Sequence, residues 1–461
     1  MKCRVVNSRD VLKVNRFDGS YHNAEVNVYD EIIKSHSDHN LDYYCSTIFT
    51  SGRARRMYTK QEFGYPFLSN ADVASQNPLS ACNYASKKYS YDETAFLKGG
   101  MILTGRVGAI GQTSFVPKFW EQYEMMGSDN IIRIVVKPEH KNGFIYAYLA
   151  SKVGNLSFWK HATGGVQPFI TDKMVGNLPI PNFPDSFQKE VDDLIQQSAT
   201  LREQAAAKLD EAKKMLVSFI NVNFDKKMFK IEKVTSKEIL QSLQYRLDPP
   251  AHIYDGVKKM EEVVAHFVCK SVGNIEAKVY RPGIFKRVYV ANGIPYIKGS
   301  EIFLTNPFRR CEQLSRTRTP FIDEMALSKG QILMTCAGSV GDVKMITKEY
   351  EDKKAIGSQD IIRIESNDDL YTSEYLFTYF QMPFVYDYIQ SMKYGSVIER
   401  IEPFHVESIP VVEPTKEISD SISALIKDYM DCTYRAFCAE EKAITMVEQE
   451  IEKWQSPTAK A

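Results

Sequence analysis

The sequence repeats itself at an offset of about 230 residues, and this duplication limits the folds that the chain can adopt. The octet GSDNIIRI at residues 127–134 returns as GSQDIIRI at residues 357–364. Residues 97–111 (LKGGMILTGRVGAIG) match residues 327–341 (LSKGQILMTCAGSVG) at the same offset. Four shorter blocks keep this order within one residue of the offset: residues 15–18 with 245–248, 52–58 with 283–289, 64–67 with 293–296, and 178–180 with 409–411. The chain is therefore predicted to be a tandem duplication of one structural unit.

Each repeat ends in a long segment without proline or glycine. Residues 187–220 carry small and apolar side chains at steps of three and four, as one face of an amphipathic helix requires. At 1.5 Å per residue this helix would be roughly 50 Å long. Residues 415–454 show the same heptad spacing, so the two helices are expected to pack on each other as a coiled coil. The seam positions are Val191, Leu194, Ser198, Leu201, Ala205, Leu209, Ala212 and Leu216, and Ile418, Ile422, Leu425, Tyr429, Cys432, Ala436, Ala439, Ala443 and Met446.

The remainder of each repeat has the pattern of a globular domain of short strands and helices. Strands are expected at residues 101–105, 115–117 and 130–136, and aromatic-rich helices at residues 143–160 and 373–393. Prolines precede both long helices. The predicted fold class is α+β, with two tandem α/β domains separated by two long antiparallel helices in a pseudo-twofold arrangement. The predicted boundaries are a domain at 1–184, a helix at 187–220, a connector at 221–245, a domain at 246–413 and a helix at 415–454.

Composition excludes several classes of protein. A chain of 461 residues is too long for a single core, and its 44% hydrophobic and 25% charged residues are ordinary globular values. Lys and Arg number 58, as do Asp and Glu, so net charge does not favour a polyanionic partner. The eight cysteines contain no CxxC pair, and no apolar run has the length of a membrane span. These features predict a soluble, cytoplasmic protein with reduced thiols and no membrane partner.

Two motifs resemble parts of catalytic sites. Residues 105–111 (GRVGAIG) resemble a phosphate-binding glycine loop, but the copy at residues 335–341 lacks the first glycine and no Lys-Ser/Thr follows. A glycine turn between two strands is the favoured interpretation. Leu247-Asp248-Pro249-Pro250-Ala251 resembles the Asp-Pro-Pro-Tyr signature of amino-methyltransferases without its aromatic residue, and a structural turn is favoured. The sequence shows no metal, cofactor or catalytic constellation, so no catalysis and no cofactor are expected in this chain.

Basic and aromatic residues gather at matching places in the two repeats. Residues 52–61 carry four cations and a tyrosine without a carboxylate, and residues 277–300 carry five cations and four aromatic residues without one. Such stretches predict a surface that faces DNA phosphates, and arginine can also read guanine edges in the major groove. The candidate DNA-binding residues are Arg53, Arg55, Arg56, Tyr58, Lys60 and Arg106 in the first repeat, and Lys278, Arg281, Lys286, Arg287, Tyr289, Lys298, Arg309, Arg310, Arg316 and Arg318 in the second.

The order of these motifs resembles the specificity subunits of type I restriction–modification systems. The motifs are Gly-x-x-(Arg/Lys)-Arg-x-Tyr, Gly-x-Pro-aromatic, Leu-x-x-Gly-x-Ile-Leu before a glycine turn, the repeated octet, and Leu/Ile-Pro-Ile/Val before a long helix. The resemblance covers essentially the whole chain, twice. It adds Gln167, the glutamine expected after a glycine turn, to the candidates. The second copy, residues 395–399 (GSVIE), lacks this glutamine.

The resemblance implies two target recognition domains that each read one half of a split sequence in double-stranded DNA. It also implies that the chain catalyses nothing itself and recruits two methyltransferase subunits, which bind S-adenosylmethionine and methylate adenine. In a full complex, restriction subunits that use ATP and Mg would join them. Two other hypotheses remain open: a standalone DNA methyltransferase that uses the Asp-Pro-Pro turn, and a helical scaffold protein that does not bind DNA.

Overall fold

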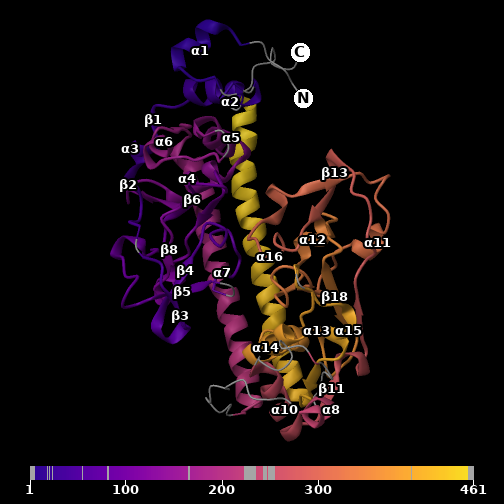
Figure 1. Cartoon of the computed structure of the whole chain (residues 1–461). Helices are drawn as coiled ribbons and strands as arrows, with labels where there is room; N and C mark the ends of the chain where they lie inside the picture. Colours follow the sequence, from indigo (N-terminus) through magenta and orange to yellow (C-terminus); the bar gives the residue numbers. More distant parts are fainter. Residues whose placement is uncertain are drawn as a thin grey trace. The chain divides into compact units, whose positions relative to one another are not determined.

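The computed structural model describes residues 6–454, except residues 18, 20, 23, 54, 80–81, 165–166, 223–234, 242–246, 248–254 and 396. The chain divides into two compact units. Unit 1 comprises Met1–Glu203 and Arg435–Ala461, and unit 2 comprises Gln204–Tyr434. The division crosses both long helices, so each unit contains half of each helix and one globular domain (Figure 1). The two tandem units of mixed helix and sheet confirm the predicted α+β class.

Unit 1 is built around a four-stranded antiparallel sheet in the order β2-β9-β6-β7. All side chains of β6 and the first four of β9 are buried, because these central strands are short continuous apolar runs. The strands are β2 (Cys45–Thr50), β9 (Ile131–Val136), β6 (Ile102–Gly105) and β7 (Thr113–Phe115).

A second sheet in unit 1 has the order β3-β5-β4-β8, and β4 pairs with β8 in parallel. A short antiparallel pair, β1 with β10, joins the start of the domain to its end. These strands are β3 (Tyr58–Thr59), β5 (Asn83–Ser86), β4 (Gly64–Leu68), β8 (Met126–Gly127), β1 (His39–Asn40) and β10 (Pro179–Ile180). The helices of this unit are α1 (Ser8–Val14), α2 (Ala24–Ser35), α3 (Leu41–Tyr44), η1 (Gln61–Phe63), η2 (Glu93–Ala95), η3 (Lys118–Tyr123), α4 (Asn142–Ala150), α5 (Lys152–His161) and α6 (Asp172–Gly176).

Unit 2 repeats the strand order of unit 1. Its first sheet runs β12-β18-β15-β16 and its second runs β14-β13-β17, while β11 pairs with β19. The strands are β12 (Ala277–Tyr280), β18 (Ile361–Ser366), β15 (Ile332–Thr335), β16 (Val343–Met345), β14 (Glu312–Leu314), β13 (Tyr289–Ile297), β17 (Ile356–Gly357), β11 (Cys269–Ser271) and β19 (Pro410–Val412). The helices are α8 (Ser236–Gln241), α10 (Asp255–His266), η4 (Val272–Asn274), η5 (Pro307–Arg309), α11 (Ile322–Met325), α12 (Lys348–Asp352), α13 (Ser373–Phe380), α14 (Pro383–Ser391) and α15 (Pro403–Glu407).

One strand differs between the copies. β13 is a single strand of nine residues where unit 1 has the separate strands β3 and β4. Its pairing with β14 slips between Tyr289 and Ile294, which both face Leu314. Gly293 lies at this bulge, and a Cβ there would come within 2.2 Å of the Leu314 carbonyl oxygen. Only glycine therefore fits this approach of the two strands.

The two long helices are α7 (Asp185–Phe219) and α16 (Lys416–Lys453), close to the ranges expected from the sequence. In unit 1 the start of α7 packs on the end of α16, where Arg202 pairs with Glu440 at 2.6 Å. In unit 2 the end of α7 packs on the start of α16, where Lys208 and Asp428 are 3.9 Å apart. Residue numbers rise along one helix as they fall along its partner, so the pair is antiparallel.

Both expected aromatic-rich helices are interrupted. Residues 143–160 form α4 and α5, separated at Ser151, whose hydroxyl caps α5 by accepting from the Gly154 N–H at 3.1 Å. Residues 373–393 form α13 and α14, and Pro383 begins α14 because it has no N–H to continue the preceding helix. The 3.6-residue periodicity predicted helices at both places but not the caps that divide them.

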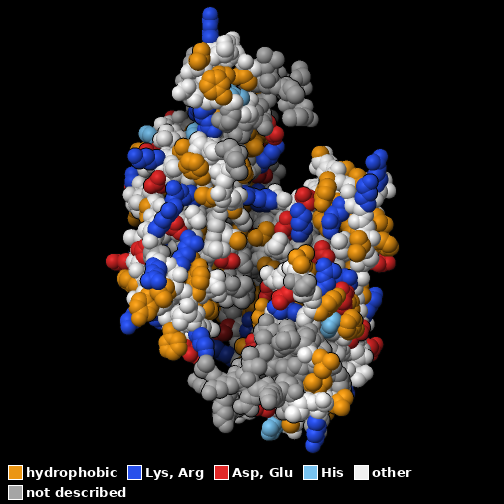
Figure 2. Space-filling view, in the orientation of Figure 1, with side chains coloured by type: hydrophobic (Ala, Val, Ile, Leu, Met, Phe, Trp, Pro, Cys, Tyr) orange, Lys and Arg blue, Asp and Glu red, His pale blue; other side chains and the backbone are white. Residues whose placement is uncertain are grey.

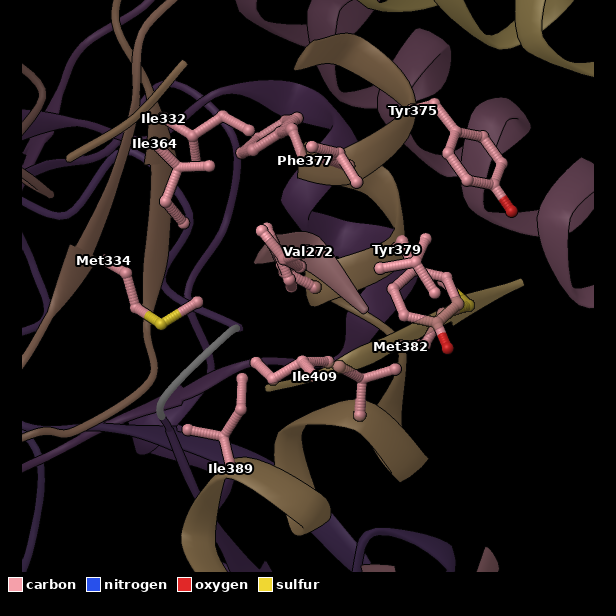
Figure 3. Close-up of a cluster of buried hydrophobic side chains, with 14 of the residues drawn as sticks. Val272, Ile332, Met334, Ile364, Tyr375, Phe377, Tyr379, Met382, Ile389 and Ile409 are labelled. Atoms are coloured by element: carbon pink, nitrogen blue, oxygen red, sulfur yellow. The ribbon is translucent and has the colours of Figure 1, made fainter. Parts of the chain in front are cut away.

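The helices of unit 2 cover one face of its first sheet and enclose its main core. Side chains of β15, β18 and α13 meet those of α14, α16 and the end of α7 in one buried cluster. The close-up in Figure 3 draws part of this cluster and labels Val272, Ile332, Met334, Ile364, Tyr375, Phe377, Tyr379, Met382, Ile389 and Ile409. Unit 1 has a matching cluster that includes Val191, Ile195, Ala443, Ile444 and Val447 from the two long helices. The apolar stripes therefore face both the other helix and the globular domain.

The repeated octet places a fully buried arginine in each unit. Arg133 donates to the carbonyl oxygens of residues Ala95, Gly127, Ser128 and Ile131. Arg363 donates to Met325, Gly357, Ser358 and Ile361, which stand 230 positions later in every case. Burial lowers the pKa of each guanidinium to about 10. Each arginine hydrogen-bonds both to the turn before its strand, β9 or β18, and to the strand itself. These bonds hold the turn in place, and with it Asp129 in unit 1 and Asp360 in unit 2.

Candidate nucleic-acid interface

The basic segment of unit 1 runs from the end of β2 into β3 without regular structure. The side chains of Arg53, Arg55 and Lys60 are exposed, and Tyr58 on β3 is 52% exposed. The segment therefore presents cations and an aromatic ring to solvent, as a phosphate-facing surface requires.

Asp129, at the turn before β9, holds two arginines of this segment. The Nη2 group of Arg56 donates to Oδ1 of Asp129, and Nε of Arg53 lies 3.3 Å from Oδ2. The guanidinium of Arg56 also lies 5.7 Å from the centre of the Phe67 ring. The Asp129 side chain is only 10% exposed, whereas those of Arg53 and Arg56 are 85% and 45% exposed. One buried carboxylate thus anchors two arginines that reach solvent.

Unit 2 builds a related arrangement around Arg287, the residue that matches Arg56. Nε of Arg287 donates to the Tyr296 hydroxyl at 2.9 Å, and its guanidinium lies 5.6 Å from the centre of that ring. Nη2 of Arg287 is 4.0 Å from Oδ2 of Asp360. Tyr296 matches Phe67, and Asp360 stands in the octet one place after the position of Asp129. Both repeats therefore hold an arginine on an aromatic ring beside an aspartate of the octet.

Other predicted cations of unit 2 also have internal partners. Arg281 pairs with Glu402 at 3.1 Å and donates to Sγ of Cys336 at 3.8 Å. Burial raises the pKa of the Cys336 thiol despite the opposing effect of Arg281, so the thiol stays protonated at neutral pH. Lys298 pairs with Glu312 at 2.7 Å.

The remaining candidates of unit 2 lie mostly around β13 and β14. The Ser315 N–H donates to the Val288 carbonyl oxygen at 2.8 Å, which brings the loops on either side of this contact together. Lys286 and Arg287 precede β13 and Tyr289 is its first residue, while Arg309 and Arg310 precede β14 and Arg316 and Arg318 follow it. Lys286, Tyr289, Arg310, Arg316 and Arg318 are exposed and Arg309 is half-buried. Lys278 lies on β12 of the first sheet, with its ammonium 4.3 Å from the Tyr280 ring centre, and Arg281 directly follows that strand.

The glycine motifs are turns between strands, as the favoured interpretation predicted. They connect β6 to β7 and β15 to β16, and Gly108 and Gly338 adopt φ angles of +75° and +77°. A short antiparallel bridge lies beside each turn. In unit 1 Phe169 pairs with both Thr163 and Val107, and the exposed Gln167 lies two residues before it, so Gln167 and Arg106 share one edge of the domain.

In unit 2 Arg400 pairs in the same way with Tyr394 and Ala337. The place of Gln167 is taken by Ile398, which is 56% exposed, beside Val397, which is 93% exposed. The two units therefore present different side chains at the same position of the fold.

The carboxylates that pair with these cations were not identified from the sequence. Residues 52–61 and 277–300 contain no carboxylate, yet the fold brings Asp129, Glu312, Asp360 and Glu402 to their arginines and lysines. The available signal was the repeated octet, which carries both aspartates. On the face drawn in Figure 2, Lys and Arg side chains are interspersed with Asp and Glu in both units.

No group of three His, Cys, Asp or Glu side chains in the described part of the chain is placed to hold a metal ion. No described helix combines the length and apolar character needed to cross a membrane. Asp248-Pro249-Pro250-Ala251, the methyltransferase-like turn, lies outside the described residues.

Comparison with known proteins gives a match in unit 2. Residues 270–435 match the model of the type I restriction modification DNA specificity domain. No curated protein matches the chain. Among solved structures, the type-I restriction-modification system S subunit from M. genitalium is 11% identical, with 90% of this chain and 95% of that chain covered and a TM-score of 0.36. The HsdS subunit from Thermoanaerobacter tengcongensis is 12% identical, with 89% and 95% covered and a TM-score of 0.27.

Proposed function

We propose that the whole chain is the specificity subunit of a type I restriction–modification system and reads a bipartite DNA target. The proposal starts from residues 270–435, which match the model of the type I restriction modification DNA specificity domain. The observation that carries the proposal is the duplication of this domain. Unit 1 has the same strand order as unit 2 and the same buried arginine in its octet. Two copies of one recognition domain suit a target in two halves.

The exposed cations would fix each domain on the DNA backbone. Arg55 and Lys60 in unit 1, and Lys286, Arg316 and Arg318 in unit 2, reach solvent on loops at the edges of sheets. Phosphate contacts of this kind set register and orientation, while a smaller number of base contacts supply the sequence preference.

The long helices would set the distance between the two half-sites. A helix of the length of α7 spans roughly 50 Å, which is the rise of about fifteen base pairs at about 3.4 Å each. Two methyltransferase subunits would dock on the outer faces of the helices and methylate an adenine flipped out of each half-site. S-adenosylmethionine would bind to those subunits, and ATP and Mg to restriction subunits where they are present, so this chain itself would catalyse nothing.

Sequencing of methylated DNA tests the proposal. Cells with and without this gene should differ in one split motif that carries modified adenines. If no such motif depends on the gene, the proposal is wrong, and methyl transfer by the purified chain alone would instead favour the standalone enzyme.

The basic loops can be tested on the same motif. Replacing Arg55 and Arg56 together with alanine should weaken binding to one half-site, and replacing Lys286 and Arg287 should weaken binding to the other. Competition assays in which neither pair of changes affects binding would show that these loops do not face the DNA.

A further inference from the structure

We infer that Arg56 and Arg287 each read a guanine in one half-site, and that Asp129 in unit 1 and Tyr296 with Asp360 in unit 2 are the residues that position them. This inference rests on the proposed function and deepens it, because it separates base-reading arginines from the phosphate-binding cations around them. The aspartates of the repeated octet, Asp129 and Asp360, lie beside these two arginines.

The two arginines are held in a way that keeps part of each guanidinium available. A guanidinium has five N–H donors in a rigid fork. Arg56 donates one of these N–H groups to Asp129, and Arg287 donates its Nε–H to the Tyr296 hydroxyl. The Arg56 and Arg287 side chains remain 45% and 33% exposed. An aromatic ring lies near each guanidinium, Phe67 in unit 1 and Tyr296 in unit 2, and restricts its orientation.

The neighbouring carboxylates favour a base over a phosphate as the ligand. A phosphate bound to Arg56 would lie beside the Asp129 carboxylate, and the two negative charges would repel each other. The O6 and N7 acceptors of guanine are uncharged and match the arginine fork in the major groove. Asp360 has the same effect beside Arg287, at 4.0 Å. An arginine tethered to an acid is therefore better suited to a base edge than to the backbone.

The neighbouring cations Arg55 and Lys286 differ from Arg56 and Arg287 in how they are held. Within the described residues, no ion pair holds Arg55 or Lys286, and both side chains are exposed. A mobile cation can follow a phosphate at any sequence, whereas discrimination between bases needs a fork that is held in place. The unit 1 site is also concave: Arg56, Phe67 and Asp129 line a shallow hollow with Ser51, Gly52 and Arg55.

The second unit reaches this arrangement with different chemistry. The acid of the octet stands one residue later, at Asp360, and only comes within 4.0 Å of Arg287. Tyr296 compensates, because its hydroxyl accepts the hydrogen bond that a carboxylate accepts in unit 1. In unit 1, Phe67 has no hydroxyl, and the Asp129 carboxylate itself accepts the hydrogen bond from Arg56. Removal of a single hydroxyl should therefore release the arginine in unit 2.

The experiment measures discrimination at each base pair of the target. The complex is purified through a tagged copy of this chain from its own cells, and its split motif is first read from methylated DNA. Competition binding then compares the target with a set of duplexes in which each G·C pair is changed in turn to A·T. A guanine read by a bidentate arginine should be preferred roughly ten- to hundredfold over the substituted pair.

Charge-preserving variants separate base reading from phosphate binding. Arg56→Lys should abolish the preference at one G·C pair of one half-site and leave the other positions unchanged, and Asp129→Asn should weaken the preference at that same pair. Arg287→Lys and Tyr296→Phe, each made alone, should weaken the preference at one and the same G·C pair of the other half-site. Arg55→Ala should instead weaken binding to all duplexes equally and lower the slope of log affinity against log salt by about one.

The outcomes distinguish this inference from the proposed function. If Arg56→Lys and Arg287→Lys keep the full preference at every pair, or weaken all duplexes equally as Arg55→Ala does, the inference is wrong and the proposed function stands. If the unaltered complex has no split target, the proposed function itself fails. Thermal unfolding of each variant identifies any that do not fold, and Tyr296→Phe, which removes only one hydroxyl, then still decides the inference in unit 2.

Discussion

The hydroxyl of Ser198 on α7 donates a hydrogen bond to the main-chain carbonyl oxygen of Ala436 on α16, at 2.8 Å. Both residues are buried, and both were expected at the seam from the heptad pattern. A side chain that reaches the backbone of the neighbouring helix requires a close approach of the two helices. The small residues in the middle of the two seams make this approach possible.

Enlarging this contact should destabilise unit 1. Ser198→Leu places extra carbon atoms in a packed seam and should lower the free energy of unfolding by about 1–3 kcal/mol. Ser198→Ala loses only the hydrogen bond and should cost about 1 kcal/mol. Urea unfolding measures both, with Gln197→Leu on the exposed face as a control. Equal stability of Ser198→Leu and the control would contradict close packing at this point.

The buried arginines of the octet should be essential to the stability of both units. Arg133→Met or Arg363→Met leaves four carbonyl oxygens without their donor, and each change should lower the free energy of unfolding by roughly 3 kcal/mol or more. The exposed Arg316→Met serves as a control in the same denaturation experiment. A loss below about 1 kcal/mol in either unit would show that the apolar replacement is tolerated, as it is at some buried ion pairs.

Lys160 and Asp30 form a buried ion pair between α5 and α2, and each side chain is 5% exposed. Burial raises the pKa of Asp30, but its hydrogen bonds to Lys160 and Lys34 outweigh this effect and lower the pKa overall. Lys160→Met should therefore cost about 3–5 kcal/mol, because it leaves a buried carboxylate with fewer partners. Adding Asp30→Leu to that variant should recover a large part of the loss. If the double variant is less stable than Lys160→Met, the cost arises from packing and not from charge.

Asp342, after the glycine turn of unit 2, should make stability depend on pH. Burial raises its pKa from 3.8 to about 6. The folded protein therefore binds the proton more tightly than the unfolded chain, and stability falls as pH rises from about 4 to about 6. Asp342→Asn removes this cost and should therefore stabilise the protein above pH 6. The shift in pKa sets an upper limit of ~3 kcal/mol, and the gain should be smaller because the carboxyl is only partly buried. Urea unfolding at pH 4.5 and pH 7.5 should show a larger gain at pH 7.5, and an equal gain at both would contradict the assignment.

Lengthening both long helices tests whether they set the spacer of the target. One heptad inserted between Glu203 and Gln204 and another between Tyr434 and Arg435, where the units divide, should lengthen each helix by about 10 Å. The spacer of unspecified base pairs between the two methylated half-sites should then grow by about three base pairs. Sequencing of methylated DNA reads this directly. A functional variant with an unchanged spacer would show that the helices do not determine the distance.

The architecture follows from repeats and residue spacings that are visible in the sequence. The 230-residue offset implies two copies of one fold, and the structure has two units with the same strand order. The absence of Pro and Gly together with three-and-four spacing predicted α7 and α16 to within a few residues, since helix formation depends on near neighbours. The glycine turns at Gly108 and Gly338 were also predictable, because a positive φ favours glycine whatever lies around it.

The tertiary structure alone decided which charges meet. Residues 52–61 have no acid in sequence, yet Arg56 lies on Asp129, which is 73 positions away along the chain. Lys298 and Glu312 come together only because β13 and β14 pair. Ion pairs depend on separation in space, and the pattern of a single segment carries no information about which distant segment folds against it. The sequence therefore determined the two repeated domains and their helices, and the fold determined which of their arginines are held by an acid.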